Sequence, residues 1–241
     1  MAKLVQKSGY IKSGKASGYM RYIATREGVE KLAGNGAVTK GQRELIQKLL
    51  HDFPDAVELF EYEDYCKTPT LGTASAFITM ALDANLHEID SESGYMQYIA
   101  TRPRVQKRGT HGLFSSATAV DLASAISELE THEGNVWPII YSLRREDAAR
   151  LEYDNANAWR TLLMESEPTL AKSMKISLDN FHWYAAFHDE GHHPHIHMMV
   201  WSDNPKEGFL TKDGIAAMRS KLTNAIFRDE MQQIYERKDA A

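Results

Sequence analysis

Cysteine is nearly absent from this chain of 241 residues, and long apolar runs are missing altogether. The single Cys66 excludes an internal disulfide, which favours a reducing cytoplasm and predicts that this residue behaves as a small apolar side chain. The longest apolar runs are far shorter than the about 20 residues that a transmembrane helix needs. Residues 1–7 also lack the apolar stretch of a signal peptide. We therefore expect a soluble cytoplasmic protein with no membrane span.

An excess of positive charge is also missing, since the net charge is −5. This charge argues weakly against non-specific binding to nucleic acid. The charge is nevertheless unevenly distributed. Residues 1–50 carry ten Lys or Arg and three acidic residues, whereas residues 51–95 carry one Lys and ten acidic residues. Residues 96–110 are basic again, with four Lys or Arg. The two basic segments could together hold a phosphate backbone, and the alternative is that they are solvated helix faces.

The sequence contains one internal repeat. Residues 18–31 read GYMRYIATREGVEK and residues 94–107 read GYMQYIATRPRVQK, with ten of fourteen positions identical. Two copies are too few for a solenoid, so we expect two similar helices, or an inserted duplication, within one domain. In each copy the two tyrosines, the isoleucine and the arginine fall on one helical stripe. The resulting interpretation is a single domain over residues 1–241 with a helical insertion around residues 32–92.

Hydrophobic periodicity predicts five strands and several helices. The strands are expected at residues 3–11, 111–116, 135–143, 181–188 and 195–202, the last two as a hairpin. The helices are expected at residues 17–31, 39–51, 72–87, 92–102, 118–131, 145–151, 155–174 and 212–236. Strands separated by helices favour an α+β fold with a central, largely antiparallel five-stranded sheet and helices packed on it.

The strongest chemical signal is the segment HDEGHHPHIH at residues 188–197. Residues two apart in a strand face the same side, so His195 and His197 project together, with the residue between them toward the core. His188 ends the preceding strand and can reach them across the hairpin. Three converging imidazoles predict a divalent-cation site, and Glu190 is close enough to orient a histidine or to act as a base. The alternatives are a structural metal site and an exposed histidine-rich turn.

The second signal is the second tyrosine in each copy of the repeat. A tyrosine hydroxyl has a pKa near 10, so its ionisation at pH 7 costs about 4 kcal/mol. A nearby metal and a cation offset much of that cost. Arg26 follows Tyr22 by one helical turn, as Arg102 follows Tyr98, so each copy provides a candidate nucleophile with a cation on the same face. The alternative is that the tyrosines pack in the core and the arginines are surface charges.

These motifs together resemble the HUH-type conjugative relaxases, which are single-strand DNA endonucleases of plasmid and integrative-element mobilisation. The closer similarity is to the MobP/MobL-like relaxases, and it covers roughly residues 3–235. The motifs that carry it are YIATREGVE, YIATRPRV, THGLF, SLRREDA and HDEGHHPH, at Tyr22–Glu30, Tyr98–Val105, Thr110–Phe114, Ser142–Ala148 and His188–His195. The fold implied by this resemblance is an HUH endonuclease-like sheet.

The resemblance implies metal-dependent, site- and strand-specific DNA nicking and strand transfer at an origin of transfer, through a covalent 5′-phosphotyrosine. The three histidines would bind a divalent metal, and Mn²⁺ or Mg²⁺ is the expected ion. Zn²⁺ or Ni²⁺ could occupy the site in a crystal. The implied partners are single-stranded origin-of-transfer DNA with an adjacent hairpin, accessory relaxosome proteins and a coupling protein. The implied DNA-binding residues are Arg21, Arg26, Arg102, Ser142, Arg144 and Arg145.

Two questions stay open at this level. We favour Tyr22 as the nucleophile, because it follows the first strand as the family's catalytic helix does, but Tyr98 has the family-like spacing to the strand near Thr110, and both could serve in turn. The function could also be that of an HUH-type rolling-circle replication initiator, although the MobL-like motifs argue against it. A third alternative is a non-catalytic origin-binding protein stabilised by a structural metal.

Overall fold

The computed structural model of the protein describes residues 3–8, 36–85, 92–101, 105–107, 110–189 and 193–228, without the side chains of residues 92–94 and Tyr98. The chain divides into two compact units, Met1–Ser8 with Met96–Ala241 and Gly9–Tyr95. The helix expected at residues 17–31 lies outside the described residues. The single domain over residues 1–241 and the insertion around residues 32–92 stay predictions.

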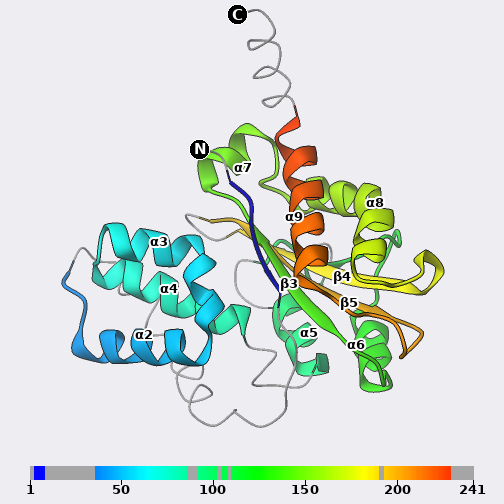
Figure 1. Ribbon diagram of the computed structural model, residues 1–241, viewed down its shortest axis with the longest axis horizontal. Helices are drawn as coiled ribbons and strands as arrows, with labels where there is room; N and C mark the ends of the chain where they lie inside the picture. The colour runs from blue at the N-terminus through cyan, green and yellow to red at the C-terminus, as the bar shows by residue number, and fades with distance from the viewer. Residues whose placement is uncertain are drawn as a thin grey trace, which may run out of the picture. The chain divides into compact units, whose positions relative to one another are not determined.

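The first unit is built around a five-stranded sheet (Figure 1). Its strands are β1 (Val5–Ser8), β2 (Leu113–Phe114), β3 (Trp137–Ser142), β4 (Phe181–His188) and β5 (His195–Ser202). They follow one another in the order β1-β3-β5-β4-β2, and every pairing is antiparallel. The predicted α+β fold with a largely antiparallel five-stranded sheet is therefore confirmed.

The residues of the central strand β5 show what each face of the sheet carries. Side chains alternate between the faces along a strand. Ile196, Met198 and Val200 are fully buried on one face and belong to the main hydrophobic core. The opposite face consequently carries the two histidines of β5, as the alternation predicted.

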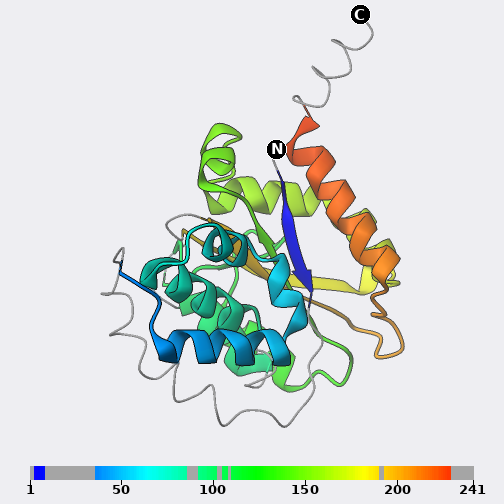
Figure 2. The same cartoon turned by 60° about the vertical axis from the view of Figure 1, so that its left-hand side comes forward.

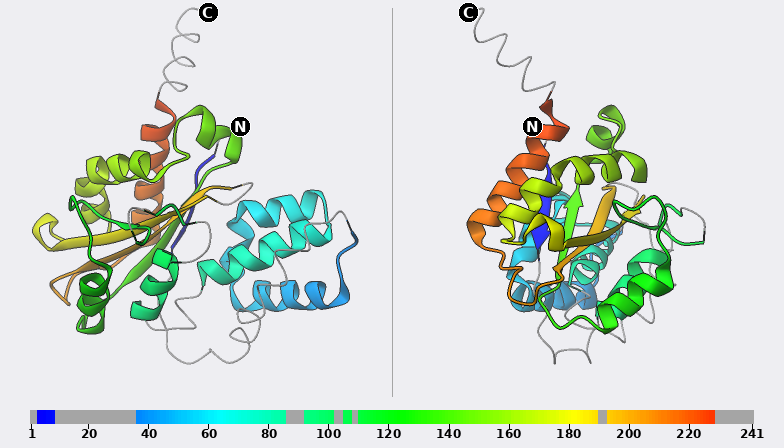
Figure 3. Two further views of the ribbon diagram at one scale, coloured as in Figure 1. Left: turned by 180° about the vertical axis from the view of Figure 1, so that it is seen from behind. Right: turned by 90° about the vertical axis from the view of Figure 1, so that its right-hand side faces the viewer.

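Helices cover the sheet, and several begin at residues that cap them. The helices in or reaching into the first unit are α5 (Glu92–Thr101), α6 (Leu122–Glu130), α7 (Arg145–Arg150), α8 (Ala156–Ser173) and α9 (Lys212–Ile226). The side chains of Asp121, Asn155 and Thr211 accept hydrogen bonds from the first turns of α6, α8 and α9. α8 and α9 lie side by side over the core face (Figure 3). None of the described helices has the length and apolar character that crossing a membrane requires.

The second unit contains the helices α2 (Lys40–Asp52), α3 (Phe60–Lys67) and α4 (Leu71–Ala84) and the 3-10 helix η3 (Pro54–Glu58). These helices pack together (Figure 2). Gln42 of α2 donates hydrogen bonds to the carbonyl oxygen of Leu71 and to the hydroxyl of Ser75, which joins α2 to α4.

Helix α3 was missed by the sequence analysis. Its eight residues, FEYEDYCK, include three acidic residues and show no apolar stripe. Cys66 in this helix is exposed, so the prediction that it behaves as a small apolar side chain is wrong. Phe60 provides the buried side of α3, and six residues further on the helix has turned by about 240°, which directs Cys66 away from that side.

Candidate metal centre

Three histidines converge where β4 ends and β5 begins. His188 lies directly across from His195 in the sheet register, and His197 is two residues further along β5. The ring centroids are 5.2 Å apart for His188 and His195, 4.6 Å for His188 and His197, and 5.0 Å for His195 and His197. Each ring offers one nitrogen, and these three atoms lie within 4.8 Å of one another. The structure therefore brings together the three histidines that the sequence singled out, and all three are buried.

Backbone carbonyls orient two of the three rings. Nε2 of His188 lies 2.9 Å from the carbonyl oxygen of Ile99 in α5, and Nδ1 of His195 lies 3.0 Å from that of His193. Because a carbonyl oxygen only accepts, a neutral ring donates its N–H there and keeps the lone pair of its other nitrogen for a cation. Carbonyl partners of this kind are typical of metal-binding histidines.

The donor set fits a divalent cation. Three neutral imidazoles suit first-row transition ions better than Mg²⁺, which prefers oxygen ligands. Three protein ligands also leave coordination positions for substrate or water, as in catalytic rather than closed structural sites. Within the part of the chain that the structure describes, this is the one cluster of at least three His, Cys, Asp or Glu residues with such spacing.

Ser142, a predicted DNA contact, lies on the histidine face of the sheet. It is directly across from His195 in the pairing of β3 with β5, and residues directly across from each other share a face. Ser142 is 2% exposed, and its Oγ has no hydrogen-bond partner among the described residues. A buried hydroxyl without a partner carries a free-energy cost, so this atom is available to a ligand bound on that face.

Arg144 and Arg145, two more predicted DNA contacts, stand at the beginning of α7. Both are half-buried, and Nη2 of Arg145 lies 2.6 Å from Oδ1 of Asp189. Asp189 directly follows His188, so this ion pair connects α7 to the strand that carries the first histidine. Asp189 was not among the site residues predicted from the sequence, although its place inside the histidine motif was an available signal.

The second copy of the repeat lies against the histidine cluster. Its helix α5 supplies the Ile99 carbonyl that contacts His188, and Tyr98 is the residue before Ile99. Beyond α5, Val105 forms a β-bridge with His188, and the backbone N–H of Gln106 donates to the carbonyl oxygen of the preceding strand residue, Phe187. The repeat drew attention to this segment, but its contact with the histidines is a finding of the structure.

The remaining predicted site residues cannot be placed in this way. Outside the described residues lie Tyr22, Glu190, Arg21, Arg26 and Arg102. The backbone of Tyr98 lies in α5, and its side chain is outside the described part. The choice between the two tyrosines and the role of Glu190 therefore stay predictions.

A cavity of about 270 Å³ adjoins the histidine cluster, because two of its lining residues flank His188 in the chain. It is lined by Val105, Gln106, Asp154, Phe187 and Asp189. The two carboxylates repel a phosphate group, so the cavity is better suited to an uncharged part of a ligand than to a DNA backbone.

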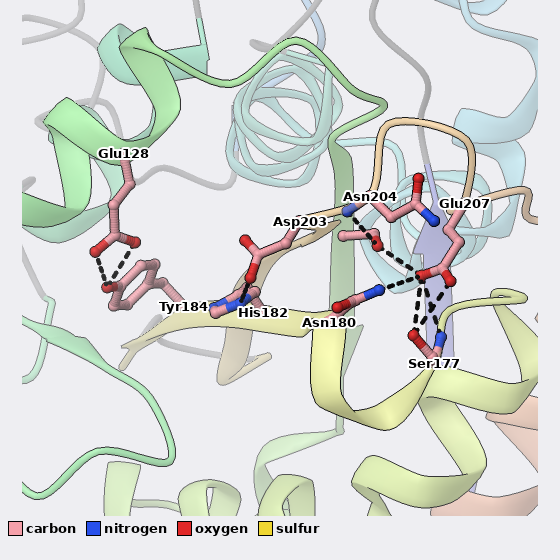
Figure 4. A network of polar contacts seen from close by, with 9 residues as sticks. Glu128, Ser177, Asn180, His182, Tyr184, Asp203, Asn204 and Glu207 are labelled. Atoms are coloured by element: carbon pink, nitrogen blue, oxygen red, sulfur yellow. Dashed lines mark hydrogen bonds and ion pairs between the residues drawn. The ribbon is translucent and has the colours of Figure 1, made fainter.

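Polar contacts secure the opposite end of the β4–β5 hairpin (Figure 4). The carboxylate of Glu207 accepts hydrogen bonds from Ser202, Asn180 and Ser177. These bonds lower the pKa of the carboxyl group, and the bond from Ser202 has the largest effect. The hydroxyl of Tyr184 donates to Glu128 at 3.1 Å. Burial, reinforced by the charge of Glu128, raises the pKa of Tyr184 to about 12, which makes this tyrosine a poor nucleophile.

A family model described as MobL relaxases matches residues 1–241. The match spans both compact units and the histidine segment. No curated protein and no solved structure matches the chain. The resemblance to MobL-like relaxases that the motifs indicated is therefore confirmed.

Proposed function

Because the chain belongs to the MobL relaxase family, we propose that it nicks one strand of DNA at a specific origin-of-transfer site and transfers that strand through a covalent 5′-phosphotyrosine. The observation that carries this proposal is the cluster of His188, His195 and His197, whose nitrogens lie within 4.8 Å of one another on a buried sheet face. Relaxase chemistry needs a cation beside the scissile phosphate, and this cluster is suited to hold one.

The proposed reaction is a transesterification by a tyrosine. The oxygen of Tyr22 or Tyr98 attacks the phosphorus, the bond from phosphorus to the 3′ oxygen breaks, and the 3′ oxygen takes up a proton and leaves as a hydroxyl. One P–O ester bond replaces another, so the leaving 3′-hydroxyl can later attack the phosphotyrosine and reseal the strand. We propose that Glu190 accepts the phenol proton or orients a histidine. Tyr98 is supported as the nucleophile by the contact of its helix α5 with His188. Tyr22 is supported as the nucleophile by its position in the sequence after β1.

A divalent ion held by the histidines would stabilise the charge that develops on the non-bridging phosphate oxygens. The neutral imidazoles leave the whole positive charge of that ion available to the phosphate. The carbonyls of Ile99 and His193 hold two of the rings in place before the substrate binds, so little reorganisation is needed during the reaction.

The proposed substrate is single-stranded origin DNA with an adjacent hairpin. Ser142 offers a hydroxyl to it beside the histidines, and Arg145 would exchange Asp189 for a phosphate. Arg–phosphate pairs can be bidentate and charge-assisted, which favours this exchange. Binding to accessory relaxosome proteins and to a coupling protein stays a prediction.

The proposal can be tested without knowing the origin. The protein is incubated with Mn²⁺ and a pool of 3′-labelled single-stranded oligonucleotides that carry a 40-nucleotide random segment. DNA that stays on the protein in a denaturing gel is then recovered and sequenced. We expect adducts whose DNA begins at one shared sequence, because the protein would hold the 5′ end made by the nick.

Two variants serve as a matched pair in this assay. His197→Ala removes one ligand and should abolish the adduct, as should EDTA. His182→Ala removes a half-exposed histidine at the other end of β4, where it contacts Asp203, and should leave the adduct intact. Bound DNA without any adduct would contradict the proposal and favour a non-catalytic origin-binding protein.

A further inference from the structure

The end of helix α5 contacts two separate parts of the histidine site through neighbouring carbonyls. The carbonyl oxygen of Ile99 lies 2.9 Å from Nε2 of His188. The next one, that of Ala100, accepts a hydrogen bond of 2.8 Å from the backbone N–H of Gly112. The last four carbonyls of a helix have no donor within that helix, so these two can take partners outside it. The position of α5 at His188 is therefore linked to the position of Gly112.

A proline distinguishes the second copy of the repeat from the first. In an α-helix the carbonyl of Ile99 would accept from the N–H of residue 103. Residue 103 is a proline, which has no N–H, whereas the first copy carries Glu27 at the corresponding position. The second copy therefore keeps the Ile99 carbonyl available for the ring of His188.

Gly112 is packed so closely that no side chain fits there. An added Cβ atom would overlap Cγ2 of Val105, and it would lie 3.2 Å from both Cβ of Val105 and the carbonyl oxygen of Gln106. Rotation of the valine could move Cγ2 away, but it would move neither Cβ nor a backbone oxygen, and the χ1 angle of a valine is strongly restricted. Any residue other than glycine would therefore push positions 112 and 105 apart.

The segment that Gly112 contacts is fixed to its surroundings on two sides. Val105 forms a β-bridge with His188. The side chain of Gln106 accepts a hydrogen bond of 2.5 Å from the backbone N–H of Ala156 at the start of α8. Because this segment is held in place, a side chain at position 112 would displace Gly112 instead and stretch its hydrogen bond to the end of α5.

We propose that Gly112 is a positioning residue of the metal centre. Its N–H holds the end of α5, and with it the carbonyl of Ile99 that orients the ring of His188 toward a bound cation. The inference rests on the metal-binding part of the proposed function and not on the nicking of DNA. Losing a partner that orients a metal-binding histidine costs about 10–100-fold in metal affinity, which sets the size of the expected effect.

The first test measures metal affinity by calorimetric titration of EDTA-treated protein with Mn²⁺ and Zn²⁺. Gly112→Ala should weaken metal binding about 10–100-fold, because the added Cβ displaces the end of α5. Adding Val105→Ala to this variant removes the overlapping Cγ2 and should restore most of the affinity.

Gly214→Ala is the matched control for this test. A Cβ at Gly214 would overlap the carbonyl oxygen of Ser173, where α9 packs on α8 at the core face of the sheet. The control should lower the Tm without metal and leave the metal affinity unchanged. Wild-type protein that binds neither ion would contradict the metal centre itself, whereas a folded Gly112→Ala variant with wild-type affinity would contradict only the positioning role.

The second test follows hydrogen exchange of backbone amides by NMR, with and without saturating Zn²⁺, and needs no substitution. Coupling between two equilibria is reciprocal, so if opening of the Gly112 hydrogen bond weakens metal binding about 10-fold, bound metal makes that opening rarer by the same factor. Exchange of the Gly112 amide should therefore slow at least about 10-fold. The amide of Asp203, which donates to Asn180 at the far end of the β4–β5 pair, should keep its rate. A Gly112 amide that slows no more than that of Asp203 would overturn the inference, even if Gly112→Ala fails to fold.

Discussion

The histidine cluster leads to a thermodynamic prediction that needs no DNA. An ion that binds only the folded protein stabilises it by RT ln(1 + [L]/Kd), which is about 2.7 kcal/mol at a concentration of 100 Kd. In a protein of 241 residues, each kcal/mol raises the Tm by about 2–4 °C. Saturating metal should therefore raise the Tm of the wild-type protein by about 5–11 °C.

Replacing His197 tests whether the three rings act together. Its ring centroid lies 4.6 Å from that of His188 and 5.0 Å from that of His195, so its removal leaves two ligands. We expect His197→Ala to lose most of the metal-induced rise in Tm. The variant also loses a fully buried side chain, which lowers its Tm without metal, so each protein is compared with itself, with and without the ion.

Calorimetry on EDTA-treated protein, followed by addition of Mn²⁺, Zn²⁺ or Mg²⁺, provides the measurement. His182→Ala should keep the full rise in Tm, because His182 contacts Asp203 at the far end of the hairpin. A wild-type protein whose Tm responds to none of these ions would refute the assignment of the cluster as a metal site. So would a His197→Ala variant with an undiminished response.

Three further predictions concern the core, the hairpin and the DNA contact. Leu163→Ala removes a fully buried side chain of α8 and should lower the free energy of unfolding in urea by about 2–5 kcal/mol. The pKa of Glu207 is lowered, mainly by the hydrogen bond from Ser202. The ionised carboxylate therefore stabilises the fold above the ordinary pKa of 4.5, and this stabilisation is lost as the pH falls through the lowered pKa. The stability difference between wild type and Glu207→Gln should accordingly be full at about pH 6 and shrink below about pH 4 in urea titrations, and a difference independent of pH would refute the hydrogen-bond explanation. Asp189→Asn releases Arg145 from a partly exposed ion pair worth at most about 1 kcal/mol, so single-stranded DNA should bind up to about fivefold more tightly at low salt, and weaker binding would contradict the exchange of partners.

Local periodicity made the centre of the site predictable. A strand alternates its side chains with a period of two, so the spacing of His195 and His197 alone put them on one face. A short connection between two paired strands brings the end of one strand beside the start of the next, which added His188. These relations depend on residues close together in the chain, and a single sequence contains them.

Contacts that depend on distant pairing could not be predicted. The carbonyl of Ile99 that orients His188 comes from 89 residues away and belongs to the backbone, which has no residue-type signature. Ser142 lies across from His195 only through the register of β3 on β5, and one sequence does not contain that register. The ion pair of Arg145 with Asp189 likewise depends on how α7 packs beside β4.

Identifying the residue that becomes linked to DNA tests the proposed phosphotyrosine chemistry directly. The adduct is digested with nuclease and trypsin, and the peptides are sequenced by mass spectrometry. Trypsin separates the candidates, because Tyr22 lies in the peptide 22–26 and Tyr98 in the peptide 68–104. We expect a nucleotide phosphate on one or both of these tyrosines in the wild-type protein and none in His197→Ala. A nucleotide on any other residue, or the same yield of adduct without His197, would contradict this expectation.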